Sequence, residues 1–274
     1  MNQHLSTRAP KQPENQHSPG NRLESGEKPI DNRESEVAGV YYAPMAETVE
    51  FRSNGSVASG YLATPPSGSG PGVLVIQEWW GLDSGIKEMA NRLAEAGFVA
   101  LAPDLYHGEL AAHDEMDKAS HLMQSLPADR AGRDMSGAVD YLASHPAVTS
   151  QGIGVVGFCM GGMLSFVIAV NRPDKVTAVV PFYGFPQGAT EPDWSTLAAT
   201  VSGHMAERDS FFSPEAARKL EARLRAMGKT VTLTVHPGTG HAFMAPHNAL
   251  GTYNAAVAAK VWPQAVSFLR AHVT

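Results

Sequence analysis

A short glycine-rich segment holds the residues best suited to chemistry. It runs Gly157-Phe-Cys159-Met-Gly161, directly after an apolar run at residues 153–156 and directly before a segment that predicts a helix. This is the spacing of a sharp strand-to-helix turn that presents a nucleophile, with cysteine in the nucleophile position. The turn needs small residues two positions before and two positions after the nucleophile, because the chain segments cross closely there. The segment therefore predicts a nucleophilic thiol at Cys159.

The expected surroundings of Cys159 favour that chemistry. The N–H groups at the start of a helix are unpaired, and together with the helix dipole they favour a thiolate and a developing oxyanion. One alternative is a buried cysteine that packs as a small apolar side chain, and another is a redox-sensing thiol, which needs no base partner. Cys159 is the only cysteine among 274 residues. An intramolecular disulfide framework and a cysteine-only zinc site are therefore excluded.

A thiol or hydroxyl nucleophile needs a base, and His241 is the best candidate. It lies in the segment 237–243, Pro-Gly-Thr-Gly-His-Ala-Phe, which follows a predicted strand. The neighbouring glycines allow the loop to turn the imidazole over the nucleophile. The nearest competing histidines are His236, His247 and His272.

The base in turn needs an acid to orient it, and Asp209 is favoured. It follows an apolar run that begins at Val201 and precedes a predicted helix at Pro214. Glu207 is the alternative, and either carboxylate could instead be solvated or cap a helix. Nucleophile, acid and histidine then follow one another in the chain order of one class of hydrolase site.

Apolar periodicity predicts the elements that position these groups. From about Val37 onward, short apolar runs alternate with longer amphipathic segments, as in βαβ units, so we expect an α/β fold whose mostly parallel central sheet has helices on both faces. Alternation around Asn54-Gly55 predicts an antiparallel edge hairpin within residues 47–63. The expected inner strands are 72–76, 98–102, 153–156, 178–182 and 230–235, and the expected helices are 84–96, 113–125, 128–144, 163–171, 214–227 and 253–272.

Composition separates a polar tail from one large domain. Residues 1–36 hold few apolar side chains and no aromatic one, so we expect a disordered tail, followed by a single domain over residues 37–274. The net charge of −6 argues against a nucleic-acid partner. No apolar run is long enough for a membrane span, and the N-terminus lacks the apolar stretch of a secretory signal. We therefore expect a cytoplasmic protein without a membrane partner.

Five segments in the same order resemble the dienelactone hydrolase family, which are cysteine hydrolases with the α/β-hydrolase fold. They span most of residues 40–274. The resemblance implies a Cys159–His241–Asp209 triad that cleaves an ester or lactone through a thioester, with no cofactor and no metal. The matching segments are Gln77-Glu78-Trp79-Trp80-Gly81, Ala102-Pro103-Asp104-Leu105-Tyr106, the Gly-x-Cys-x-Gly-Gly turn, the Asp209 loop and Gly240-His241-Ala-Phe243.

The resemblance also assigns roles around the nucleophile. Glu78 is implied to lie beside the cysteine and to help release its proton when substrate binds. The backbone N–H groups of Met160 and Trp79 are implied to hold the oxyanion. We expect further substrate contacts from aromatic and polar side chains near the strand ends, namely Trp80, Tyr106, His107 and Phe243.

The sequence departs from the family where substrate carboxylates are bound. Well-known members hold that group with two arginines, yet here no arginine occurs between Arg92 and Arg130, and the residues just after Phe243 are Met-Ala-Pro. His107 would be a weaker and pH-dependent substitute. An uncharged ester or lactone is therefore the expected substrate, acted on by a monomer or small homo-oligomer. The alternatives are a general carboxylesterase or thioesterase with the same triad, and a catalytically silent binding module of the same fold.

Overall fold

The computed structural model describes residues 44–53 and 55–274. The expected tail, residues 1–36, lies outside the described residues, as does Asn54 at the tip of the predicted hairpin.

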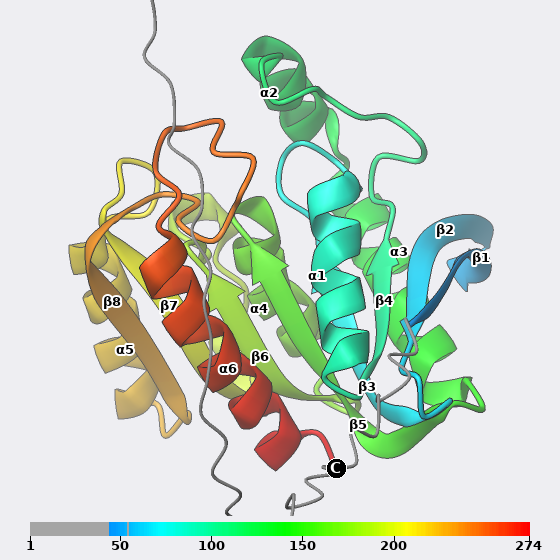
Figure 1. Cartoon of the computed structure of the whole chain (residues 1–274). Helices are drawn as coiled ribbons and strands as arrows, with labels where there is room; N and C mark the ends of the chain where they lie inside the picture. The colour runs from blue at the N-terminus through cyan, green and yellow to red at the C-terminus, as the bar shows by residue number, and fades with distance from the viewer. Residues whose placement is uncertain (1–43, 54) are drawn as a thin grey trace, which may run out of the picture. The chain divides into compact units, whose positions relative to one another are not determined.

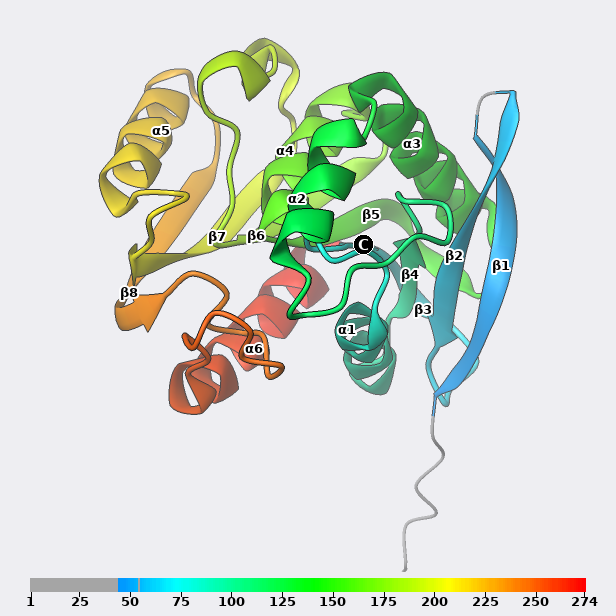
Figure 2. The ribbon, with the colours of Figure 1, turned by 90° about the horizontal axis from the view of Figure 1, so that it is seen from above.

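The described residues form one sheet of eight strands in the order β1-β2-β4-β3-β5-β6-β7-β8 (Figures 1 and 2). β1 and β2 pair as an antiparallel hairpin at one edge, and β2 is also antiparallel to β4. The other neighbours are parallel. The strands are β1 (Met45–Ser53), β2 (Ser56–Thr64), β3 (Gly70–Ile76), β4 (Val99–Pro103), β5 (Val148–Phe158), β6 (Val176–Phe182), β7 (Thr200–Arg208) and β8 (Val231–Gly240).

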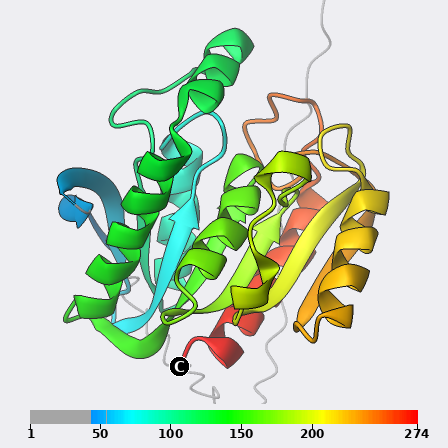
Figure 3. The same cartoon turned by 180° about the vertical axis from the view of Figure 1, so that it is seen from behind.

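Helices cover both faces of the sheet. α1 and α6 pack on the face toward the viewer in Figure 1, and α3, α4 and α5 pack on the face seen in Figure 3. α2 lies beyond the carboxyl ends of the strands (Figure 1). No helix within the described part of the chain is long and apolar enough to cross a bilayer. The helices are α1 (Ser84–Glu95), α2 (Met116–Ser125), α3 (Ala128–Ser144), α4 (Met160–Asn171), α5 (Pro214–Ala226) and α6 (Ala255–His272), with short 3₁₀ turns η1 (Gly188–Thr190) and η2 (Trp194–Thr196).

This architecture confirms the predicted α/β-hydrolase fold with its N-terminal edge hairpin. Two details of the prediction were wrong. The strand expected at 230–235 is β8, which lies at the edge of the sheet; Val231 and Leu233 are buried, whereas Thr232 and Thr234 are exposed. The helix expected from residue 113 begins at Met116, because residues 112–115 form a turn instead.

The turn between β5 and α4 is built from close backbone contacts. A Cβ atom on Gly157 would collide with the carbonyl oxygen of Gly161, and one on Gly161 would collide with the carbonyl oxygen of Ile76. Cys159, between the two glycines, has φ 54° and ψ −116°, a conformation that L-residues rarely adopt. The surrounding packing therefore holds a strained residue in place.

We expect Gly157→Ala to destabilise the fold by more than about 2 kcal/mol, because its methyl group meets backbone atoms that cannot move aside without separating β5 from α4. Gly132→Ala is the matched control. Gly132 lies within α3, and a Cβ atom there would meet only the Asn171 side-chain amide, at an ordinary contact distance of 3.8 Å, so alanine should stabilise by about 0.5–1 kcal/mol. Chemical denaturation of both variants measures the two effects, and equal stabilities would contradict the steric argument.

Candidate active site

The Cys159 thiol lies at the start of α4. Its backbone N–H donates to the Phe182 carbonyl at 3.1 Å, which ties the turn to β6. Met160 is the first residue of α4, so its N–H has no acceptor within the helix. Cys159, Met160 and Trp79 line the same cavity, as the resemblance implies for a nucleophile and its oxyanion donors.

Strand register brings the expected acid and base together. β7 and β8 are parallel neighbours, and Arg208 is paired with Gly240 near their carboxyl ends. The residues that follow, Asp209 and His241, are therefore adjacent. Asp209 Oδ2 lies 2.8 Å from His241 Nδ1, and both side chains are buried.

The second carboxylate oxygen of Asp209 is also satisfied. Its Oδ1 accepts the backbone N–H groups of Phe211 and Phe212, each at 2.9 Å. These bonds orient the carboxylate, so that Nδ1 of His241 is the donor to Asp209 and Nε2 is left for the Cys159 thiol.

The environment of His241 favours the imidazolium form. Burial lowers its pKa, but hydrogen bonds to Asp209 and Cys159 and the charges of those two groups outweigh burial and raise the pKa to about 10. The imidazole is thus a strong acceptor for the thiol proton.

Glu78 follows the end of β3 and is almost fully buried. Its Oε1 accepts the Tyr183 hydroxyl at 3.2 Å, and its Oε2 lies 3.3 Å from His247 Nε2. Burial and the neighbouring Glu78 and Cys159 charges raise the pKa of Tyr183 well above its usual range, so the phenol stays protonated as the donor. Tyr183 and His247 thus hold the two carboxylate oxygens of Glu78, which lines the cavity.

The cavity measures about 410 Å³ and is mostly apolar. Among the described residues, no lysine or arginine contributes to its lining, so none of them can clamp an anionic substrate group there. α2 and the loop after His241, which are far apart in sequence, both contribute residues to its lining. Its lining residues are Glu78, Trp79, Trp80, Met123, Gln124, Cys159, Met160, Met163, Gln187, Thr190, Phe211, Phe212, His241, Ala242, His247 and Leu250.

Of the four expected substrate contacts, only Trp80 lines this cavity. Tyr106 is buried behind it, with its hydroxyl 3.2 Å from the Trp79 carbonyl. Phe243 is buried against Tyr183.

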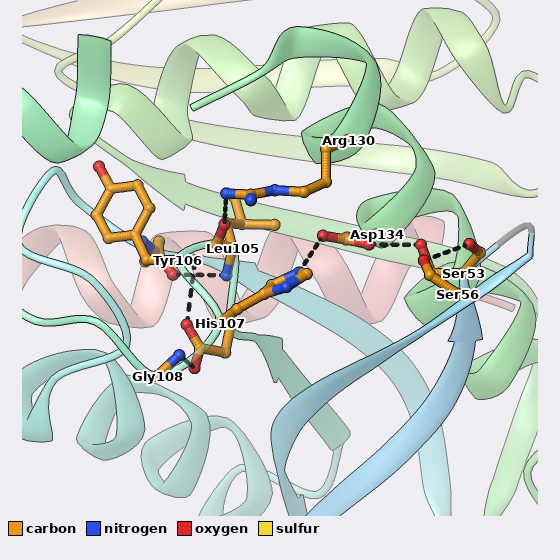
Figure 4. Close-up of polar contacts among 10 residues, drawn as sticks. Ser53, Ser56, Leu105, Tyr106, His107, Gly108, Arg130 and Asp134 are labelled. Atoms are coloured by element: carbon orange, nitrogen blue, oxygen red, sulfur yellow. Dashed lines mark hydrogen bonds and ion pairs between the residues drawn. The ribbon is translucent and has the colours of Figure 1, made fainter. Parts of the chain in front are cut away.

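His107 is turned to another part of the molecule. Its φ of 53° directs the side chain toward α3, where Nε2 lies 2.8 Å from Asp134 (Figure 4). Asp134 also accepts the Ser53 hydroxyl of β1. His107 therefore tethers the loop after β4 and does not reach the cavity.

The competing residues also have other partners. His236 Nε2 lies 3.0 Å from His204 Nδ1, and burial lowers the pKa of His204 to about 3. His272 is exposed near the end of α6, and the Glu207 carboxylate accepts the Gly238 N–H at 2.9 Å. Within residues 44–53 and 55–274, no group of three or more His, Cys, Asp or Glu side chains is arranged to hold a metal ion.

Sequence reasoning missed the contributions of α2 and of His247. Met123 and Gln124 of α2 and Gln187 and Thr190 near η1 line the cavity, yet none of them belongs to a motif. From the sequence, His247 is considered only as a competitor of His241. Its position six residues later in the same loop nevertheless indicates that it can reach the site.

The sequence model of the Dienelactone hydrolase family matches residues 58–273 of this chain. The chain belongs to this family. It is therefore a hydrolase that acts on carboxylic ester bonds. Among its relatives, Protein usf of Aquifex pyrophilus is 37% identical over 236 residues, covering 84% of this chain and 100% of the relative.

A second relative, from Aquifex aeolicus, carries the provisional name carboxymethylenebutenolidase. It is 34% identical over 235 residues, covering 84% of this chain and 100% of its own. Among solved structures, a dienelactone hydrolase-like promiscuous phosphotriesterase, P91, from metagenomic libraries superposes with a TM-score of 0.73 at 23% identity, over 85% of this chain and 100% of that one. That likeness supports the fold.

The raised pKa of His241 predicts a pH-dependent contribution to stability. The pKa of His241 is about 10 in the folded chain and 6.5 ordinarily. The contact of its imidazolium with Asp209 therefore stabilises the fold fully below pH 6.5, and this stabilisation is lost as pH rises toward 10. Asp209→Asn keeps an oxygen for the two amides but removes the charge. The excess stability of the unsubstituted chain over this variant should be greatest near pH 6 and shrink by pH 10. Denaturant titrations at pH 6, 8 and 10 measure it, and an excess that grows with pH would contradict the assignment.

Proposed function

We propose that this hydrolase cleaves an uncharged ester or lactone through a thioester on Cys159, with His241 as base and Asp209 as its orienting acid. The observation that carries the proposal is the meeting, in one cavity, of a strained cysteine at a helix N-terminus with a buried His–Asp pair. This combination supplies a nucleophile, a proton acceptor and a site for the oxyanion.

In the first half of the reaction, His241 Nε2 takes the proton from the Cys159 thiol, and the thiolate attacks the carbonyl carbon. The resulting oxyanion accepts hydrogen bonds from the backbone N–H groups of Met160 and Trp79. When the tetrahedral intermediate collapses, the carbon–oxygen bond breaks and His241 returns the proton to the leaving alkoxide. In a lactone, that alcohol stays attached to the acyl chain.

In the second half, water gives a proton to His241 and attacks the thioester carbonyl. The same N–H groups hold the second oxyanion, and the carbon–sulfur bond then breaks. The departing Cys159 thiolate recovers its proton from His241, and the carboxylic acid leaves. Glu78 lies in the same cavity and serves as a second acceptor for the thiol proton as substrate arrives, the role implied for it by the family resemblance.

The cavity favours an uncharged substrate. Glu78 contributes a negative charge, and no lysine or arginine in the lining offsets it. The walls are formed largely by Trp79, Trp80, Phe211 and Phe212, which bury flat apolar groups. A cavity of about 410 Å³ accommodates a small ester or lactone. The Aquifex aeolicus name points to a carboxylated lactone, for which this chain offers no arginine clamp.

The cytoplasmic location and the monomeric or small homo-oligomeric state expected from the sequence remain predictions. A general esterase or thioesterase with the same triad would share every group above, so the choice among substrates has to be measured.

The test is hydrolysis of p-nitrophenyl acetate and of a small lactone panel, with and without a carboxylate, by the unsubstituted chain, Cys159→Ser and Cys159→Ala. We expect turnover with a preference for uncharged substrates, and a loss of at least about 100- to 1,000-fold in the variants, at the scale of losing one oxyanion donor. Circular dichroism checks that both variants fold. Full activity of folded Cys159→Ala would remove the proposed nucleophile, and no turnover by any form would favour a binding module.

A further inference from the structure

His247 is held in one tautomer. Its Nδ1 accepts the backbone N–H of Ala249 at 3.1 Å, so Nδ1 carries no proton. The neutral ring therefore carries its proton on Nε2, which faces Glu78 Oε2 at 3.3 Å. The contact with Ala249 thus leaves Nε2 as the ring nitrogen that donates to Glu78.

A second histidine fixes the plane of this ring. His113, just before α2, stacks on His247 with ring centroids 3.8 Å apart and an angle of 21° between the rings. His113 Nε2 lies 2.8 Å from Asp83 Oδ2, and Asp83 Oδ1 accepts the Ile86 N–H at the start of α1. The stack is therefore anchored to a helix end.

Trp80 completes the cluster by presenting its ring at a steep angle to both imidazoles, at 5.2 Å from His113 and 6.2 Å from His247. The ring of His247 is thus restrained on several sides, and its side chain is only 13% exposed. Such a donor has little freedom to leave Glu78.

We propose that His247 is a positioning residue that orients the Glu78 carboxylate in the cavity that it lines together with Cys159. The inference rests on the proposed function, because Glu78 matters there as a neighbour of the thiol. The titratable groups that bear on it are Tyr183 on Glu78, His113 and Asp83 behind His247, and Cys159 and His241 in the same cavity wall.

Loss of the His247 donor has two consequences of opposite sign. A carboxylate with one donor fewer takes up a proton at higher pH. Neutral Glu78 repels a thiolate less, so Cys159 reacts faster with an alkylating agent in mildly acidic solution. The same neutral Glu78 cannot serve as the second acceptor of the thiol proton beside His241, so hydrolysis slows at a higher pH than before. A merely structural disturbance would slow both reactions.

The experiment compares His247→Phe, which keeps a ring for the stack but loses the donor, with His247→Gln, whose amide nitrogen can replace Nε2. His145→Phe is the matched control. His145 Nδ1 accepts the N–H of Ala147 in the same way, at 3.2 Å, but His145 lies at the end of α3 and does not line the cavity. Because Cys159 is the only cysteine, the total rate of iodoacetamide labelling reports on this thiol alone.

In His247→Phe we expect labelling at pH 5.5–6 to accelerate by up to about tenfold and the acid limb of kcat/KM to move up by about one pH unit, the scale of one hydrogen bond to a charged group. His247→Gln should restore both, and His145→Phe should change neither. Unchanged profiles in His247→Phe would overturn the inference, as would equal losses in the Phe and Gln variants without a change in pH dependence.

The proposed function fails by a separate result, namely full hydrolysis by folded Cys159→Ala, which has no nucleophile at this position. The labelling experiment needs no turnover, so it still reports whether His247 acts on the surroundings of Cys159 when hydrolysis does not proceed as proposed.

Discussion

The contact between the backbones of β5 and α4 is the constraint on which the site depends. Gly157 and Gly161 touch without side chains, and the chain between them must pass through a left-handed conformation at Cys159. That geometry places Cys159 at the N-terminus of α4, where it lines the cavity together with Met160. It also links the fold directly to reactivity, because the residue that bears the strain is the proposed nucleophile.

The remaining groups reach the cysteine through ordinary strand geometry. Parallel strands end at one edge of the sheet, so Glu78 after β3, Asp209 after β7 and His241 after β8 converge there although they are far apart in sequence. The reactive groups and the rest of the cavity wall come from different segments of the chain. The strand ends carry the groups proposed to move protons, and the turns after β3 and β7 supply the aromatic side chains of the wall, while α2 and the long loop before α6 add further apolar contacts.

Local patterns in the sequence predicted most of the fold, because apolar periodicity reports directly on burial. The α3 bounds and the start of α1 agree with the structure, and Asp209 lies beside His241 as the triad hypothesis requires. Features set by tertiary context were harder to predict. The edge position of β8 depends on strand order, and the direction of His107 depends on one backbone angle and on a buried Asp134 far along the chain. The stack of His113 on His247 joins two loops that no motif connects.

The charge of the cavity wall bears on how a cycle ends. The proposed substrate enters without charge, but its hydrolysis creates a carboxylate in the cavity that Glu78 also lines, where no lysine or arginine among the described residues retains it. Repulsion between the two anions weakens binding of the acid relative to the substrate from which it came. On the proposed chemistry, the absence of a cationic clamp among the described lining residues therefore narrows the range of substrates and also favours release of the acid, which limits product inhibition.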